Sequence, residues 1–238
     1  MKFKKIDEKY LAERKDFSSK YGKRDIWEVM DHWPLYVGNS NLQRVLSIYE
    51  LLKTTINVPG HIAEFGSWKG SNVMFMAKVL NMIDPYSNKL VYSFDSFEGL
   101  TEFNEKDNEA ISLKGAYRGS LEELTDLMAL NNLDDNINIQ KGYIENTLPA
   151  LLEADPALSF SLIYCDTDLY ASTKVILDSL HSRLMKGGLF IFDEWNHPTW
   201  PGETTAAREF LNEHGVKYEV LHIQNTRQPT LALKKKGE

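Results

Sequence analysis

The feature that most constrains this chain is a repeated alternation of short apolar segments with amphipathic ones. Runs suited to β-strands occur at residues 61–65, 90–94, 137–140, 161–165 and 189–192. Apolar side chains at helical spacing occur at residues 41–52, 72–82, 121–130, 172–184 and 203–213. We expect Gly187-Gly188 to end the fourth of these helices, and the polar residues 98–118 to form a loop. Strands that alternate with helices pair in parallel and are covered on both faces, so the pattern predicts an α/β fold.

The end of the chain departs from this alternation. Residues 217–222 and 230–233 have the composition of strands, but only a short link separates them. We therefore expect an antiparallel pair at this edge. A mostly parallel seven-stranded sheet with an antiparallel last strand and helices on both faces is the usual shape of Rossmann-like class I S-adenosylmethionine (SAM) methyltransferases. Other doubly wound proteins also carry an antiparallel edge strand, so this pattern alone leaves the class open.

Charge and cysteine content exclude several classes of protein. The net charge of −7 argues against nucleic acid as a partner, because binding to phosphates needs a basic surface. The apolar runs are far shorter than the ~20 residues that cross a bilayer, so we expect no membrane partner. The single cysteine, Cys165, excludes a disulfide framework and a multi-thiolate zinc site. Together with the absence of an apolar signal segment in the first residues, it favours a cytoplasmic location.

The predicted sheet divides the chain into two parts. Residues 1–40 are charged and aromatic, and we expect them to form a helical extension that serves as a lid or as an oligomer contact. Residues 41–238 would form the catalytic domain.

Residues at the ends of the first three predicted strands favour a nucleoside-type ligand. The turn that starts at Glu64 carries Gly66 and Gly70, which allow a close approach of backbone to ligand. Asp95 follows the second strand and could accept hydrogen bonds from both ribose hydroxyls. The segment 142–144 (Gly142, Tyr143 and Ile144) follows the third strand, where it would flank an adenine ring. Each feature alone could be a simple turn or cap, but together they favour the ligand.

Four carboxylates follow the next two strands. Asp166 and Asp168 come after residues 161–165, and Asp193 and Glu194 come after residues 189–192. Because adjacent parallel strands end at the same edge, these like charges would meet, which is costly unless a cation or protons neutralise them. Oxygen ligands of this kind suit Mg²⁺ or another divalent cation. The alternative is that these carboxylates cap helices, but capping would give no role to Asp166 and Asp193.

Five motifs in this order carry a resemblance to a known family. They are Glu64-Phe65-Gly66 with Gly70-Ser71, Phe94-Asp95-Ser96-Phe97-Glu98-Gly99-Leu100, Lys141-Gly142 with Asn146-Thr147-Leu148-Pro149, Asp166 with Asp168-Leu169-Tyr170, and Gly187-Gly188 with Asp193. Across roughly residues 36–212 the chain resembles the macrocin O-methyltransferase family, whose members depend on SAM and a divalent metal. Asp193-Glu194-Trp195 stands where that family usually has Asp-Asp-Tyr, and Glu194 keeps the negative charge of the second aspartate with a side chain one methylene longer.

The resemblance implies a role for each matching residue. The residues expected at SAM are Glu64, Gly66, Ser67, Gly70, Ser71, Asp95, Ser96, Phe97, Gly142, Tyr143, Ile144 and Asp166. Mg²⁺ or another divalent cation would be held by Asp166, Asp193 and Glu194, and Asp168 would be the general base. The implied reaction moves a methyl group to a hydroxyl of a sugar or sugar-containing metabolite, such as a nucleotide sugar, a glycoside or a polysaccharide precursor. A homo-oligomer is also common among the family's known members.

The loop after the last carboxylate supplies candidates for substrate contact. Trp195 and Trp200 suit stacking on a sugar, although packing of both indoles on the core explains them equally well. His197 is a further candidate, as a substrate contact or a substitute base. The same metal chemistry would serve a catechol-like or other non-sugar diol. An NAD-type oxidoreductase is disfavoured by the absence of G-x-G-x-x-G, and a non-catalytic scaffold would have little use for four clustered carboxylates.

Overall fold

The computed structural model describes residues 4–100, 103–107, 113–224 and 226–237. Within these residues one seven-stranded sheet has the strand order β3-β2-β1-β4-β5-β7-β6. Its strands are β1 (His61–Phe65), β2 (Val91–Asp95), β3 (Ile137–Lys141), β4 (Phe160–Cys165), β5 (Leu184–Phe192), β6 (Tyr218–His222) and β7 (Leu231–Lys235). Strands β1 to β5 pair in parallel, and β7 runs antiparallel to both β5 and β6. The predicted class I methyltransferase architecture is therefore confirmed.

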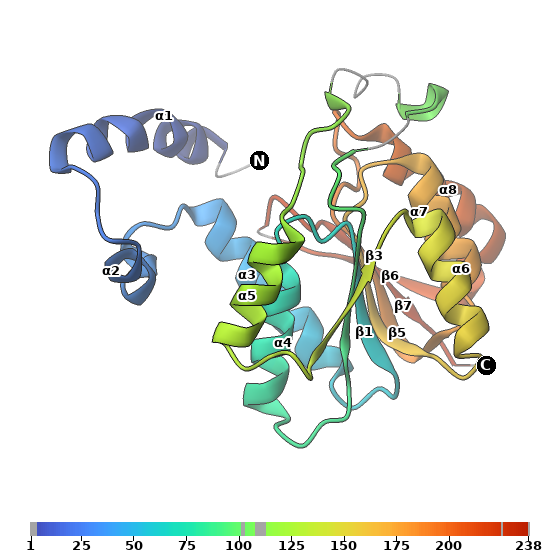
Figure 1. Cartoon of the computed structure of the whole chain (residues 1–238). Helices are drawn as coiled ribbons and strands as arrows, with labels where there is room; N and C mark the ends of the chain where they lie inside the picture. Colours follow the sequence, from blue (N-terminus) through green and yellow to red (C-terminus); the bar gives the residue numbers. More distant parts are fainter. Residues whose placement is uncertain (1–3, 101–102, 108–112, 225, 238) are drawn as a thin grey trace.

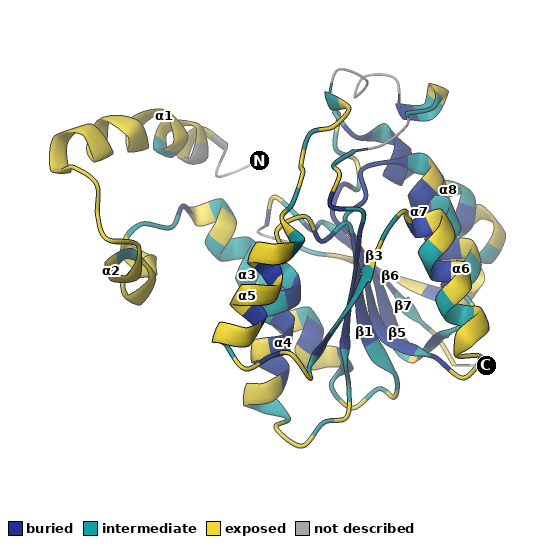
Figure 2. Cartoon of the chain, in the orientation of Figure 1, coloured by how far each residue is buried: buried dark blue, intermediate teal, exposed yellow. Residues whose placement is uncertain are grey.

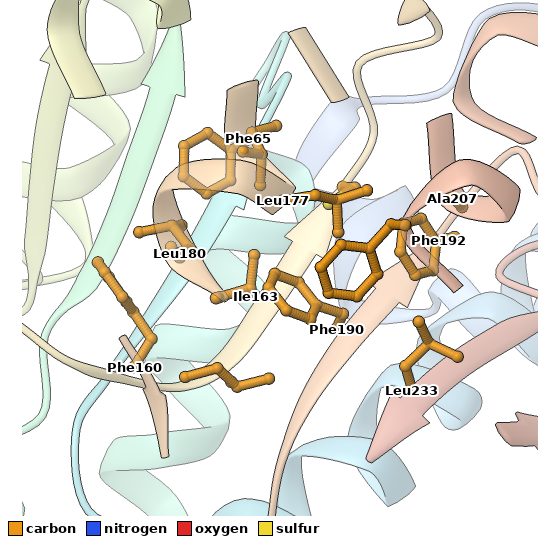
Figure 3. Packing of buried hydrophobic residues seen from close by; sticks show 14 of the residues in the cluster. Phe65, Phe160, Ile163, Leu177, Leu180, Phe190, Phe192, Ala207 and Leu233 are labelled. Atoms are coloured by element: carbon orange, nitrogen blue, oxygen red, sulfur yellow. The ribbon is translucent and has the colours of Figure 1, made fainter. Parts of the chain in front are cut away.

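Helices cover both faces of the sheet (Figure 1). One layer holds α3 (Asn39–Thr55), α4 (Ser71–Ile83) and α5 (Leu121–Leu130), and the other holds α6 (Ile144–Ala154), α7 (Tyr170–Leu180) and α8 (Pro201–His214). Side chains alternate along each strand, so Leu162 and Tyr164 of β4 pack on the first layer while Ile163 and Cys165 pack on the second. Figure 3 shows the second core, where Phe190 and Phe192 of β5 lie beside Leu177 of α7. Burial on both faces explains why the central strands are almost wholly apolar.

The predicted end of the fourth helix is wrong. Gly187-Gly188 does not stop α7, which already ends at Leu180; both glycines lie within β5. Between β4 and β5 the register passes from Phe160↔Leu184 to Leu162↔Leu189, so the glycines form a bulge. A Cβ at Gly188 would lie 2.8 Å from the carbonyl oxygen of Ser161. The glycines therefore allow close approach of two strands, which the sequence pattern does not distinguish from a helix stop.

The sequence pattern did not predict helix α6. Its apolar residues Ile144 and Leu148 are buried one turn apart, but Pro149 lies inside the helix. A proline in a helix removes a hydrogen bond to the carbonyl four residues earlier, and it obscures the helical pattern. Part of the predicted loop at 98–118, namely residues 101–102 and 108–112, lies outside the described residues.

The N-terminal segment extends away from the three-layered body of sheet and helices (Figure 1). It contains α1 (Lys4–Tyr21), α2 (Ile26–Asp31) and the 3₁₀ turn Trp33–Leu35. Most of its residues are exposed to solvent (Figure 2). The hydroxyl of Tyr10 donates to the carbonyl of Tyr36 at 2.5 Å, which ties α1 to the start of the body. The division of the chain at residue 40 stays a prediction. In the part of the chain that is described, no helix has both the length and the apolar character needed to cross a membrane.

Candidate active site

A cavity of about 610 Å³ lies where the parallel strands end. This volume is within the usual range of roughly 300–1,000 Å³ for small-molecule sites, and the position is the one where open α/β sheets bind ligands. Its lining includes most of the residues predicted to bind a ligand: Glu64, Gly66, Ser67, Ser71, Asp95, Ser96, Gly142, Tyr143, Ile144, Asp166, Asp168, Asp193, Glu194 and Trp200. Helix α3 adds Asn41, Arg44 and Val45.

The turn after β1 brings backbone to the cavity surface. Gly66 has φ of +85°, and a Cβ there would lie 1.9 Å from the carbonyl oxygen of Asp166. Only glycine therefore lets this turn pack against the end of β4. The amide of Gly66 donates to the carbonyl of Phe94 at 2.8 Å, which fixes the turn to β2.

Glu64 places a buried carboxylate beneath this turn. Its side chain is 1% exposed, and Oε1 accepts a hydrogen bond from Asn72 Nδ2 at 2.7 Å. Burial raises the pKa of Glu64 well above its usual value, and the nearby charge of Asp166 adds to the effect. Oε2 has no hydrogen-bond partner among the described residues. A buried oxygen left in this way is costly, and the cationic amino group of a ligand such as SAM would satisfy it.

Asp95 joins the turns that follow β1 and β2. Its Oδ2 accepts from the amide of Trp68 at 2.7 Å and its Oδ1 from the amide of Phe97 at 2.6 Å. Burial raises the pKa of Asp95, while these two amide bonds lower it. Each carboxylate oxygen keeps a further lone pair, so the side chain can still accept hydrogen bonds from ribose hydroxyls.

Two of the residues predicted to bind SAM lie outside the cavity lining as described. Gly70 is the residue before α4 and has φ of +77°, and the side chain of Phe97 packs in the core beneath α4 and α5. Both shape the turns that carry the lining residues. Tyr143, which does line the cavity, also donates its hydroxyl to Glu98 Oε2 at 2.8 Å.

The predicted gathering of carboxylates is present at the ends of β4 and β5. Carboxylate oxygens of Asp166, Asp168 and Glu194 lie within 4.8 Å of one another. Asp193 lies beside this group, where its Oδ1 accepts from the hydroxyl of Tyr164 at 2.5 Å. Oxygen donors in such a cluster are those that Mg²⁺ and Ca²⁺ use, and the buried Glu194 Oε2 has no hydrogen-bond partner in the described part of the chain. The residues therefore fit a divalent cation.

Crowding and burial change the acidity of the cluster. Burial, reinforced by Asp193, raises the pKa of Asp166 to about 7. Burial and the same neighbouring charges raise the pKa of Glu194 to about 8. The pKa of Asp168 is raised well above its usual value, first by burial and then by Asp166 and Glu194. Without a cation, the cluster therefore holds protons near neutral pH.

Arg44 is a residue of this site that the sequence analysis missed. Its Nη1 donates to Asp193 Oδ2 and its Nη2 to Asp166 Oδ2, each at 2.8 Å. A signal was available, because Arg44 lies four and eight residues before the buried Ile48 and Leu52. A charged residue in line with buried positions on one helix face indicates a charged partner in the interior.

Helix α8 and the last loop fix the position of Glu194. The fully buried Glu203 accepts from the amide of Glu194 at 2.7 Å, and Thr204 Oγ1 donates to its carbonyl at 3.2 Å. Gln228 Nε2 donates to Glu194 Oε1. The sequence analysis did not find Glu203 or Gln228, because both reach the site from segments that only the fold brings near.

The two tryptophans that were predicted to contact the substrate lie in different surroundings in the structure. Trp200 lines the cavity and packs edge-on against Tyr117, with 6.1 Å between ring centroids. Trp195 packs on the sheet core under the guanidinium of Arg208 and is absent from the described lining. His197 is also absent from that lining; its Nδ1 accepts from the amide of Thr199 and lies 3.3 Å from Glu194 Oε2. Tyr117, which lines the cavity, was missed because it lies in a segment predicted as a polar loop.

The strand order, the reversed last strand and a nucleoside-sized cavity at the carboxyl ends of the parallel strands together define a class I methyltransferase. The chain belongs to the macrocin O-methyltransferase family, whose model matches residues 3–228. This match confirms the resemblance carried by the five motifs and the predicted enzyme class, an O-methyltransferase. It also extends the resemblance through most of the N-terminal segment.

Named relatives agree with this assignment, and a solved structure shares the fold. The chain is 30% identical over 195 residues to 8-demethyl-8-(2,3-dimethoxy-alpha-L-rhamnosyl)-tetracenomycin-C 4'-O-methyltransferase of Streptomyces olivaceus, covering 78% of this chain and 71% of that enzyme. It is 26% identical over 175 residues to mycinamicin III 3''-O-methyltransferase of Micromonospora griseorubida, covering 70% of this chain and 66% of that enzyme. The structure of the calicheamicin methyltransferase CalS11 superposes with a TM-score of 0.84 at 24% identity, covering 98% and 93% of the two chains.

Proposed function

We propose that this protein transfers the methyl group of SAM to a hydroxyl of a sugar or sugar-containing metabolite, with the help of a divalent cation. The observation that carries the proposal is the cluster of Asp166, Asp168 and Glu194 beside a cavity with nucleoside-binding features. The names of the relatives support a sugar as acceptor, since one acts on a rhamnosyl group of a tetracenomycin. A catechol-like or other non-sugar diol would use the same chemistry, but no feature of the cavity favours it.

The donor would lie along the turns after β1 and β2. The absence of a side chain at Gly66 allows close contact, and Glu64 Oε2, which has no partner among the residues that the structure describes, would accept from the amino group of SAM. Asp95 would accept from the ribose hydroxyls, and the segment 142–144 would flank the adenine.

Asp166, Asp193 and Glu194 would hold Mg²⁺ or another divalent cation. A bound cation would lower the proton affinity of the acceptor hydroxyl and orient it toward the methyl group. Asp168 lies beside these ligands with φ of +62°, a backbone conformation that a non-glycine residue adopts at some cost. The turn therefore holds its carboxylate at the edge of the cluster, where it faces the cavity.

Asp168 would act as the general base. The hydroxyl oxygen would form a bond to the methyl carbon as the carbon–sulfur bond breaks, and the hydroxyl proton would pass to the Asp168 carboxylate. Burial raises the pKa of Asp168, and the positive charge of a bound cation would favour the ionised carboxylate that accepts the proton. The ring faces of Trp200 and Tyr117 would pack against the sugar.

The N-terminal segment would serve as a lid or as the contact between two copies of the chain. Its helix α2 has no buried residue, and apolar side chains such as Trp27 are exposed. The single cysteine supports a cytoplasmic location for the enzyme.

Calorimetric titration of EDTA-treated protein with SAM, repeated after addition of Mg²⁺, tests the proposal. We expect micromolar binding of SAM and a separate binding isotherm for Mg²⁺. Absence of SAM binding under both conditions would refute the donor site. Binding of SAM without any binding of Mg²⁺, Mn²⁺ or Ca²⁺ would refute the metal site while leaving the donor site intact.

A further inference from the structure

The guanidinium of Arg44 bridges two carboxylates that belong to adjacent strands. Its two terminal nitrogens each donate at 2.8 Å, one to Asp166 after β4 and the other to Asp193 after β5. The side chain of Asp193 is 2% exposed, so little water reaches it. A planar guanidinium matches such a pair of acceptors, which makes these charge-assisted bonds strong ones.

Both oxygens of Asp193 are engaged in this arrangement. Tyr164 donates to Oδ1 and Arg44 donates to Oδ2. Asp166 Oδ2 is engaged by Arg44 as well. Arg44 is thus bound to two of the three residues that would hold the divalent cation. A divalent cation held by the same two carboxylates would lie close to the guanidinium of Arg44, and the two positive charges would repel each other.

We propose that Arg44 is a built-in counter-ion of the metal site, which a divalent cation displaces from Asp166 and Asp193 when it binds. The inference rests on the proposed function, because it presumes the metal site. The side chain of Arg44 is 25% exposed and lines the cavity, so its guanidinium can turn into the cavity while α3 stays in place. The arginine stabilises the cluster before metal binds and lowers the apparent affinity for metal.

Substitution of Arg44 separates these two effects. In Arg44→Met, the carboxylates lose their internal cation but keep their positions on β4 and β5. We expect this variant to bind Mn²⁺ roughly 10- to 100-fold more tightly than the parent protein at about pH 8.5, because no charged hydrogen bonds must be broken. In EDTA we expect a lower melting temperature than that of the parent, because like charges are then unneutralised. Saturating Mn²⁺ should remove or reverse that difference.

Two variants serve as controls. Arg208→Gln removes another arginine of the same region, whose Nη2 donates to Asn196 and to no carboxylate in the described structure; its Mn²⁺ affinity should change less than about twofold. Arg44→Lys keeps the charge but loses the two-pronged geometry, so it should bind Mn²⁺ with intermediate affinity, and it keeps the test informative if Arg44→Met does not fold.

The outcomes distinguish this inference from the proposed function. Equal or weaker Mn²⁺ binding by both Arg44 variants would overturn it, and so would unchanged stability of Arg44→Met in EDTA. If no form of the protein binds Mn²⁺, the inference fails together with the metal site. A parallel SAM titration of the same samples then shows whether the donor site still stands.

Discussion

Asp168 shows how one residue is given a function by its surroundings. It follows β4, adopts φ of +62°, and is only 9% exposed beside Asp166 and Glu194. Neither burial nor backbone strain would favour an aspartate there on grounds of stability alone. Both are consistent with the proposed base, since residues held in unfavourable conformations cluster at active sites.

We predict that Asp168→Asn abolishes methyl transfer and spares SAM binding. The amide cannot accept the hydroxyl proton, and a neutral side chain also removes repulsion within the cluster. Turnover should fall at least about 100-fold, within the range expected for loss of a general base. Methylated product measured by mass spectrometry and SAM affinity measured by calorimetry check this. Asp178→Asn, at an exposed ion pair with Lys174, is the control, and retained activity of Asp168→Asn would refute the assignment.

The turn after β1 requires Gly66 because glycine has no side chain. An alanine methyl there would collide with the carbonyl of Asp166, and the backbone angle is also unfavourable for any other residue. Gly115 has a similar φ of +78°, but a Cβ added there would meet nothing within 4 Å, so it isolates the backbone effect from the collision.

We predict that Gly66→Ala lowers the free energy of unfolding by about 1–3 kcal/mol more than Gly115→Ala does, the usual cost of forcing extra volume into a packed site. The shifted turn should also weaken SAM binding. Urea unfolding and calorimetry on both variants provide the measurement. Equal destabilisation of the two variants would contradict the prediction, because it would show that the turn after β1 can shift away from β4 and avoid the collision.

At the scale of elements, the arm formed by α1 and α2 differs in character from the body. Residues 1–31 contain nine Lys or Arg and seven Asp or Glu, a net charge of +2, which leaves −9 for the rest of a chain whose total is −7. Exposed apolar side chains on α2 include Ile26, Trp27 and Met30, which are 61%, 57% and 51% exposed. An arm of net positive charge with exposed apolar side chains would suit contact with the acidic body of a second copy.

We predict that replacing Ile26, Trp27 and Met30 together by serine converts an oligomer to a smaller species. Because the side chains are exposed within one chain, the free energy of unfolding should change by no more than about 0.5 kcal/mol per site. Sedimentation velocity gives the size. Serine at Met82, Tyr86 and Val216, which are exposed on the body, is the matched control. An unchanged sedimentation coefficient of the arm variant would contradict the role of the arm as an oligomer contact. The role as a lid would then remain.

At the scale of the whole molecule, the buried acids make stability depend on pH. The folded protein raises the pKa of Asp166 to about 7 and that of Glu194 to about 8, while the unfolded chain has values near 4. The folded state therefore binds more protons than the unfolded state between these values. Stability contributed by the protonated cluster is present below about pH 4 and is lost as pH rises through 7 and 8.

We predict that the metal-free protein loses a few kcal/mol of unfolding free energy from these groups between about pH 5 and pH 8.5. Saturating Mg²⁺ should flatten this dependence, because the cation stabilises the charged carboxylates. Denaturant unfolding across the pH series, in EDTA and in Mg²⁺, measures it. Asp166→Asn should show a shallower slope in EDTA, and stability that rises over this range in EDTA would contradict the assignment of these acids.

Local patterns in the sequence determined most of the architecture. Apolar alternation is a property of neighbouring residues, and it predicted the strands, five of the helices, the reversed final strand and the carboxylates that follow β4 and β5. It failed at α6, where Pro149 breaks the helical pattern, and at Gly187-Gly188, where a bulge against β4 looks like a helix stop. The family's motifs added the expected role of Asp168 as general base, which local patterns alone could not assign.

Only the tertiary structure decided which distant side chains meet. Arg44 reaches Asp193 across 149 residues, and Gln228 reaches Glu194 across 34. It also separated Trp200, which lines the cavity, from Trp195, which packs on the core. The physical reason is that a hydrogen bond depends on distances of a few ångströms and on the direction of each side chain. Sequence patterns determine which face of an element is buried, but the packing of one element on another determines what each buried polar group finds there.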